Sequence, residues 1–125
     1  MALVLFDKDA VIDFIPEWNG NRESDKPFVV KLKYISFGKM RGYAQKIDAA
    51  LKSTKDEAEK AEKTLDVQKQ QFIDNVTGFE NVTIKGKKVT DPVEFYDLAP
   101  PDLIYEILNA MQDYQKLTEG QRKNS

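Results

Sequence analysis

The pattern of apolar and polar positions is most regular over residues 37–76, where apolar or small side chains recur mostly every three or four residues. This stripe consists of Met40, Ala44, Ile47, Leu51, Ala58, Ala61, Leu65, Phe72 and Val76. Such heptad-like spacing predicts an amphipathic helix. One continuous helix would extend about 60 Å, whereas a compact domain of this size has a radius of gyration of about 14 Å. The segment must therefore fold back, project from the domain or lie against another chain.

The middle of this segment allows two interpretations. Between Leu51 and Leu65 the stripe carries only alanine, which buries little area, and Thr54 with Glu57 forms a capping-box pattern. Two helices over residues 37–52 and 55–76, joined by a tight reversal, would satisfy this pattern. We favour one continuous helix, because the segment lacks proline and its glycines lie near its start.

Shorter patterns predict two strands before the helix. Residues 10–16 are rich in β-branched and aromatic side chains and end at Pro16, and residues 27–35 alternate between two faces, one of which exposes lysines. We expect an antiparallel hairpin around the polar loop of residues 18–26. Ser36 is then placed to cap the following helix.

After the long segment, Gly78 is expected to end the helix, and residues 81–90 are expected to form a second, small hairpin. Asp91 and Pro92 predict the start of a short helix that reaches Leu98.

The last helix opens at residues 100–101 and has the strongest amphipathic pattern in the chain. Its apolar stripe is Leu103, Ile104, Ile107, Leu108 and Met111. We expect Leu117 to add a contact and residues 118–125 to fray. The predicted fold class is α+β, with one domain over residues 1–125.

The composition narrows the class of protein. The chain has 125 residues, of which 41% are apolar and 10% aromatic, so a folded domain is expected. Charged residues make up 32% of the chain, but the net charge is only −2, which gives no overall attraction to nucleic acid or anionic lipid. The apolar run after Met1 is too short for a signal peptide, and no run approaches the roughly 20 apolar residues of a membrane span. A cytoplasmic protein is expected.

The residue inventory offers little for catalysis. Histidine and cysteine are both absent, which removes the commonest general base and the usual zinc ligands. The serines lack a nucleophile motif, and the glycines at 38 and 42 do not form a phosphate-binding loop. We expect no catalytic site, no cofactor and no metal ion.

Four residues are candidates for a protein interface: Trp18, Ala58, Ala61 and Leu65. Trp18 stands in a polar loop, where it either covers the core, which we favour, or anchors a partner. The alanines suit either a core seam or a seam between chains, and we expect them to meet another helix of this chain or of a partner. Lys85, Lys87 and Lys88 are more typical of a solvated turn than of a phosphate site, because no arginine or aromatic residue accompanies them.

From Phe72 onward the order of features resembles a known group of proteins. The features are Phe79-Glu80-Asn81 before a strand, the turn at 85–89, Asp91-Pro92, Pro100-Pro101-Asp102-Leu103, Glu106-Ile107, Leu117-Thr118-Glu119 and the ending Lys123-Asn124-Ser125. In the N-terminal half, a strand, a polar loop and residues 27–30 lead into the long helical segment. This order resembles the small tail assembly chaperones encoded in the tail-gene clusters of tailed phages and prophages.

The resemblance implies a non-catalytic protein that binds an unassembled tail protein, often the tape measure. The alanine stripe adds the expectation of contacts with further copies of the chain, and charge and composition predict neither a nucleic acid nor a membrane partner. The alternative function is a structural head–tail or tail component that stays in the finished particle.

Overall fold

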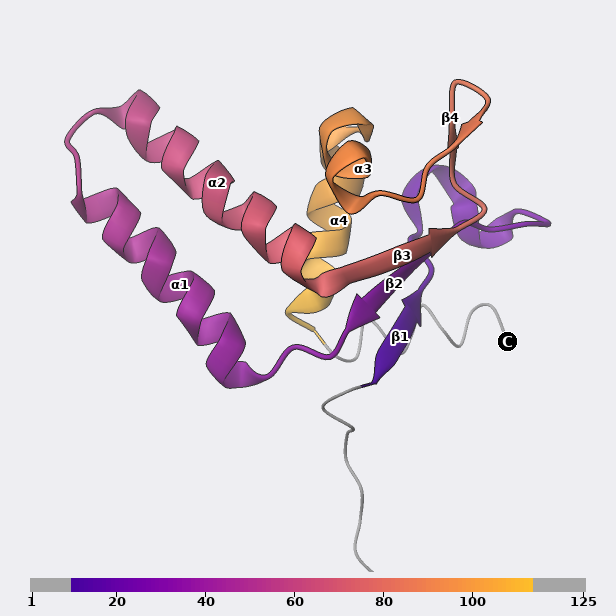
Figure 1. The fold of residues 1–125 in the computed structure, drawn as a ribbon, viewed down its shortest axis with the longest axis horizontal. Coiled ribbons are helices and arrows are strands. Elements are labelled where there is room, and N and C mark those ends of the chain that lie inside the picture. Colours follow the sequence, from indigo (N-terminus) through magenta and orange to yellow (C-terminus); the bar gives the residue numbers. More distant parts are fainter. Residues whose placement is uncertain (1–9, 114–125) are drawn as a thin grey trace, which may run out of the picture.

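The computed structural model describes residues 10–113 and has an α+β fold (Figure 1). Its strands are β1 (Val11–Phe14), β2 (Val29–Lys33), β3 (Val76–Glu80), β4 (Thr83–Ile84) and β5 (Lys87–Lys88). Its helices are the 3-10 helix η1 (Trp18–Glu23) and the α-helices α1 (Phe37–Lys52), α2 (Glu57–Asn75), α3 (Pro92–Leu98) and α4 (Pro101–Met111). The predicted positions of Leu117 and residues 118–125 lie outside the described residues.

The first hairpin is confirmed, because β1 and β2 pair antiparallel with Ile12 opposite Leu32. A third strand was not predicted: β3 pairs antiparallel with the other edge of β2 and gives the sheet order β1-β2-β3. The expectation that Gly78 caps the helix is wrong, since α2 ends at Asn75 and Gly78 lies within β3. Pairing with β2 supplies the backbone hydrogen bonds that a longer helix would otherwise have made.

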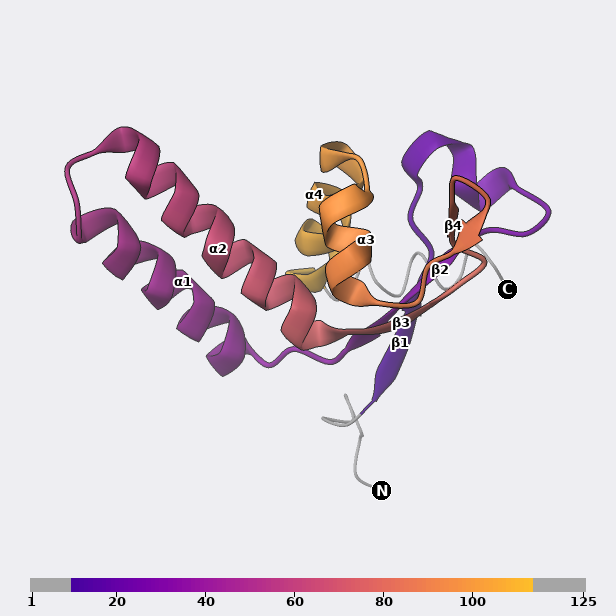
Figure 2. The same ribbon diagram turned by 45° about the horizontal axis from the view of Figure 1, so that its top comes forward.

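The core lies between this sheet and the C-terminal helices, which stand side by side over one face of the sheet (Figures 1 and 2). Inward residues of β1 and β2 join α3, α4 and the end of α2 in one cluster. Its rings meet closely, with centroids 5.9 Å apart for Phe72 and Phe95 and 4.4 Å apart for Phe79 and Phe95. The stripe of α4 is buried as predicted, and the caps Ser36 and Asp91 both accept a backbone N–H.

The opposite face of the sheet carries a charge cluster that links its three strands. Lys31 of β2 lies 3.2 Å from the Asp13 carboxylate of β1 and 3.3 Å from the Glu80 carboxylate of β3. Hydrogen bonding to Asp13, and then to Glu80, raises the pKa of Lys31 above its usual value. The side of the sheet away from the core is therefore held by polar side chains.

The prediction of one continuous helix over residues 37–76 is wrong, and the reversal is the correct alternative. Helices α1 and α2 run side by side and project from the sheet, with their turn at the far end (Figures 1 and 2). Tyr43 is the buried apolar residue of α1, and it lies outside the main core cluster. The stripe therefore does not describe a single packed helix, because its two halves belong to antiparallel helices.

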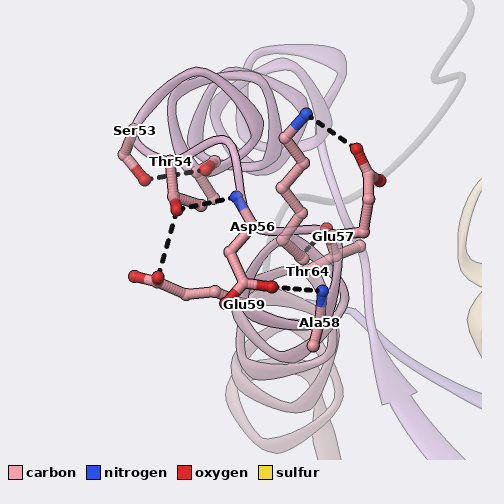
Figure 3. A network of polar contacts seen from close by, with 9 residues as sticks. Ser53, Thr54, Asp56, Glu57, Ala58, Glu59 and Thr64 are labelled. Carbon is pink, nitrogen blue, oxygen red and sulfur yellow. Dashed lines mark hydrogen bonds and ion pairs between the residues drawn. The ribbon is translucent and has the colours of Figure 1, made fainter.

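Polar side chains stop α1 and start α2 at the turn (Figure 3). The Ser53 hydroxyl donates to the Ala50 carbonyl at 2.8 Å, and the Asp56 carboxylate accepts from the Ala58 N–H at 3.0 Å. The cap of α2 is thus Asp56 and not the Thr54 of the expected capping box. Thr54 accepts from the Asp56 N–H and donates to the Glu59 carboxylate, so it orders the turn from outside the helix.

Buried polar groups hold the base of the helical hairpin. The amide of Asn75, a residue with no exposed surface, donates to the Tyr43 hydroxyl at 3.0 Å and to the Gln71 carbonyl at 2.7 Å. The Tyr43 hydroxyl donates to the Asp74 carboxylate at 3.0 Å. Burial, and then hydrogen bonding and charge from Asp74, raise the pKa of Tyr43 above its ordinary value, against the lowering effect of the Asn75 bond. Directional bonds therefore join α1 to α2 at the base of the hairpin.

Candidate protein-interaction surface

Large apolar side chains are exposed where α2, α3 and α4 come together. Leu98 of α3 is 56% exposed, Tyr105 of α4 is 47% exposed and Leu65 of α2 is 48% exposed. Val93 of α3 is also exposed. Scattered apolar residues are normal on a surface, but Leu65 and Tyr105 line one hollow together with Ala99, and Leu98 is the chain neighbour of Ala99. Their grouping makes this region a candidate binding surface.

Leu65 lines a shallow hollow of about 290 Å³ between α2 and the C-terminal helices. The rest of its lining is Tyr96, Asp97, Ala99, Pro101, Ile104 and Tyr105. Burial raises the pKa of Tyr96, and the neighbouring Tyr105, Asp97 and Asp66 raise it further. The Lys69 ammonium pairs with Asp97 at 3.3 Å and lies 5.8 Å from the centre of the Tyr96 ring. We call this site the Leu65 hollow; it has an apolar floor and charges at its rim.

Trp18 lines a second hollow, of about 380 Å³, which we call the Trp18 hollow. Besides Trp18 of η1, its apolar lining includes residues next to β2, in and next to β4, and in α3, namely Phe28, Val82, Ile84, Phe95 and Leu98. Ala99, in the link between α3 and α4, lines both hollows. The two hollows with Leu98 and Tyr105 therefore form one surface on both sides of that link, and we call it the α3–α4 face.

Trp18 is held in place by polar contacts that sequence reasoning missed. The Glu106 carboxylate of α4 accepts the backbone N–H of Glu17 at 2.6 Å and that of Trp18 at 3.0 Å. The buried Asn21 amide donates to the Pro16 and Phe28 carbonyls and accepts the Phe28 N–H. The loop from β1 to β2 is thereby fixed against α4, and Trp18 packs as a partly buried cover of the core, the interpretation favoured from the sequence.

A third and larger hollow, of about 630 Å³, lies on the other side of Tyr105 and is more polar. It contains Arg22, whose side chain is 8% exposed and pairs with Glu17 at 2.7 Å. The Arg22 Nε donates to the Ile15 carbonyl, and the guanidinium carbon lies 6.0 Å from the centre of the Phe14 ring. Asp102, Glu106 and Asn109 complete its polar lining. We call it the Arg22 hollow; its carboxylates outnumber its single cation.

The structure brings together two of the four predicted interface residues. Trp18 and Leu65 both border the α3–α4 face, through hollows that share Ala99. Ala58 and Ala61 lie further along α2 and are exposed. Helix α1 runs beside α2 (Figures 1 and 2) but leaves both alanines uncovered. Their contact with a partner helix stays a prediction.

Other kinds of site have little support among residues 10–113. No three acidic side chains there are grouped so as to hold a metal ion. Within the same residues, no helix is both long and apolar enough to cross a membrane. The lysines at 85, 87 and 88 are exposed around the tip of the second hairpin. Comparison with protein-family models, with curated proteins and with solved structures finds no match.

Proposed function

We propose that this chain is a non-catalytic assembly chaperone of phage or prophage origin, which binds an unassembled tail protein of the tape-measure kind in the host cytoplasm. The α3–α4 face is the observation that carries the proposal. Its exposed apolar side chains offer a surface on which an apolar segment of a partner would be covered before assembly. The order of sequence features from Phe72 onward supports the same class of protein.

The proposal is tested by co-expression with the large tail protein encoded beside it. We expect the chain to keep that protein soluble and the variant Leu98→Asp to lose most of this effect, since a carboxylate opposes burial of the face. Leu51→Asp is the matched control, because Leu51 is also an exposed leucine near the end of a helix, on α1 and away from the face. The proposal would be contradicted if the tail protein were equally soluble with and without this chain, or if the neighbouring genes included no tail genes.

The alternative is a structural component that remains in the particle. The projecting α1–α2 hairpin favours it, because Phe37 and Leu51 are exposed there and offer a second surface for a neighbouring subunit. Mass spectrometry of purified particles separates the two functions. A chaperone is absent from finished particles, whereas a structural component is present in a fixed ratio to the other tail proteins.

A further inference from the structure

The acidic and basic residues of this protein are unevenly distributed along the chain. Residues 91–113 contain six acidic residues and no lysine or arginine, whereas the whole chain has a net charge of only −2. The acidic residues are Asp91, Glu94, Asp97, Asp102, Glu106 and Asp113. The charged side chains of helices α3 and α4 are therefore all acidic.

Three of these carboxylates lie next to the apolar α3–α4 face. Asp97 lines the Leu65 hollow, while Asp102 and Glu106 line the Arg22 hollow on the other side of Tyr105. Tyr105 lines both hollows, so its ring stands between an apolar site and an acidic one. Lys69 of α2 pairs with Asp97 at the rim of the Leu65 hollow. Around the two hollows beside Tyr105, the carboxylates outnumber the cations, so the net charge next to the apolar face is negative. The carboxylates are Glu17, Asp97, Asp102 and Glu106, and the cations are Arg22 and Lys69.

The geometry favours a helical partner over a strand. A strand binds by adding to an open sheet edge, where it finds free backbone groups. The Leu65 hollow is bounded by side chains of helices, whose backbone groups are already bonded within each helix. An amphipathic helix needs only side-chain pockets, which the two hollows beside Ala99 provide.

We propose that the α3–α4 face binds a basic amphipathic helix of the partner, with its apolar side chains in the Trp18 and Leu65 hollows. Lysine or arginine side chains beside that apolar stripe pair with Asp97 and Asp102. Negative charge on the face opposes nucleic acid and anionic lipid, which leaves a cationic protein segment as the complementary ligand. This inference rests on the proposed function and specifies the chemistry of the partner segment.

Two synthetic helical peptides test the inference on the full chain. The first carries leucine at every third or fourth position with lysine at the flanking positions, and the second has glutamate in place of each lysine. Neither contains tryptophan, so the emission of Trp18, the single tryptophan of the chain, reports binding next to the face. We expect the lysine peptide to shift this emission and to bind more weakly as salt is added. The glutamate peptide should leave the emission unchanged.

Two double variants that remove acidic charge test where the lysine peptide binds. The double variant Asp97→Asn and Asp102→Asn should weaken binding of the lysine peptide roughly three- to twentyfold, as expected for two exposed ion pairs. The control Asp48→Asn with Glu57→Gln removes the same charge at the far end of the helical hairpin and should bind as the unaltered chain does. Circular dichroism verifies that both variants are folded.

Several results would overturn the inference. They are equal binding of the two peptides, no binding of the lysine peptide, and equal effects of the two double variants. A concentration-dependent dimer that Leu98→Asp dissociates would also overturn it, because it would assign the face to a second copy of this chain. If the tail protein is kept soluble but the peptides bind alike, only the basic character fails. If the lysine peptide binds and no tail protein is kept soluble, the proposed function fails instead.

Discussion

At the scale of single residues, one side chain of α4 holds a distant segment of the chain in place. Glu106 lies on α4, yet both of its carboxylate oxygens accept backbone N–H groups at the start of η1. Bonds to a carboxylate are stronger than neutral ones, and losing it leaves two donors without this partner. This one side chain positions Trp18, which in turn borders the α3–α4 face.

Replacement of Glu106 by alanine is therefore expected to lower the free energy of unfolding by about 2 kcal/mol. Freed from this contact, Trp18 should gain exposure and its emission should move to longer wavelength. Asn109→Ala serves as the control, because Asn109 is an exposed residue of the same helix. Chemical denaturation followed by fluorescence measures both effects; equal midpoints for the two variants would contradict this role of Glu106.

At the scale of elements, the helical hairpin depends on how its turn is capped. The distal part of α2 is rich in charged residues, and Ala58 and Ala61 are exposed, so apolar burial contributes little there. Asp56 satisfies a free N–H at the start of α2, and its negative charge suits the positive end of that helix.

Asp56→Ala is expected to cost about 1 kcal/mol of stability, the usual effect of losing an N-cap. Glu62→Ala removes the same charge from an exposed position within α2 and should change stability by less than half of that amount. Hydrogen exchange should show faster exchange in the first turn of α2 for the cap variant alone. If exchange there is unaltered, Asp56 is not the residue that sets the start of α2.

For the molecule as a whole, polar side chains add links between elements on the sides that face away from the main core. The Tyr43–Asp74–Asn75 group joins α1 to the end of α2, and the Lys31 cluster joins the three strands on the face of the sheet away from the core. The folded state raises the pKa of Tyr43 above its ordinary value of 10.0, first through burial. Folding therefore favours the neutral phenol.

This linkage predicts a loss of stability at alkaline pH. The contribution of Tyr43 is fully present below pH 10, the ordinary pKa, and is lost as the pH rises through the higher pKa of the folded state. Tyr43→Phe has no phenol to ionise, so its unfolding free energy should fall less between about pH 9 and 11. Other groups with raised pKa values, such as Lys31 and Tyr96, change the unfolding free energy equally in the unaltered chain and in the Tyr43→Phe variant. Parallel curves for the two proteins in urea denaturation would contradict the prediction.

The sequence by itself determined the features that depend on neighbouring residues. The first hairpin, the second hairpin, the caps at Ser36 and Asp91 and the stripe of α4 were all predicted, since turn chemistry, capping and periodicity act over a few residues. The predicted long helical segment was right in its extent apart from its final residue, but wrong in its continuity.

Tertiary structure alone decided the features that need distant partners. The start of β3 pairs with a strand more than forty residues away in the chain, as in Leu32 opposite Val76, and no local pattern marks that pairing. The gathering of Trp18, Leu65 and Tyr105 around one face depends on how α2, α3 and α4 pack. The residues near a position in the chain predict its local conformation. Which distant residues lie beside it on the surface depends on how all the elements pack, because burial is a property of the whole arrangement.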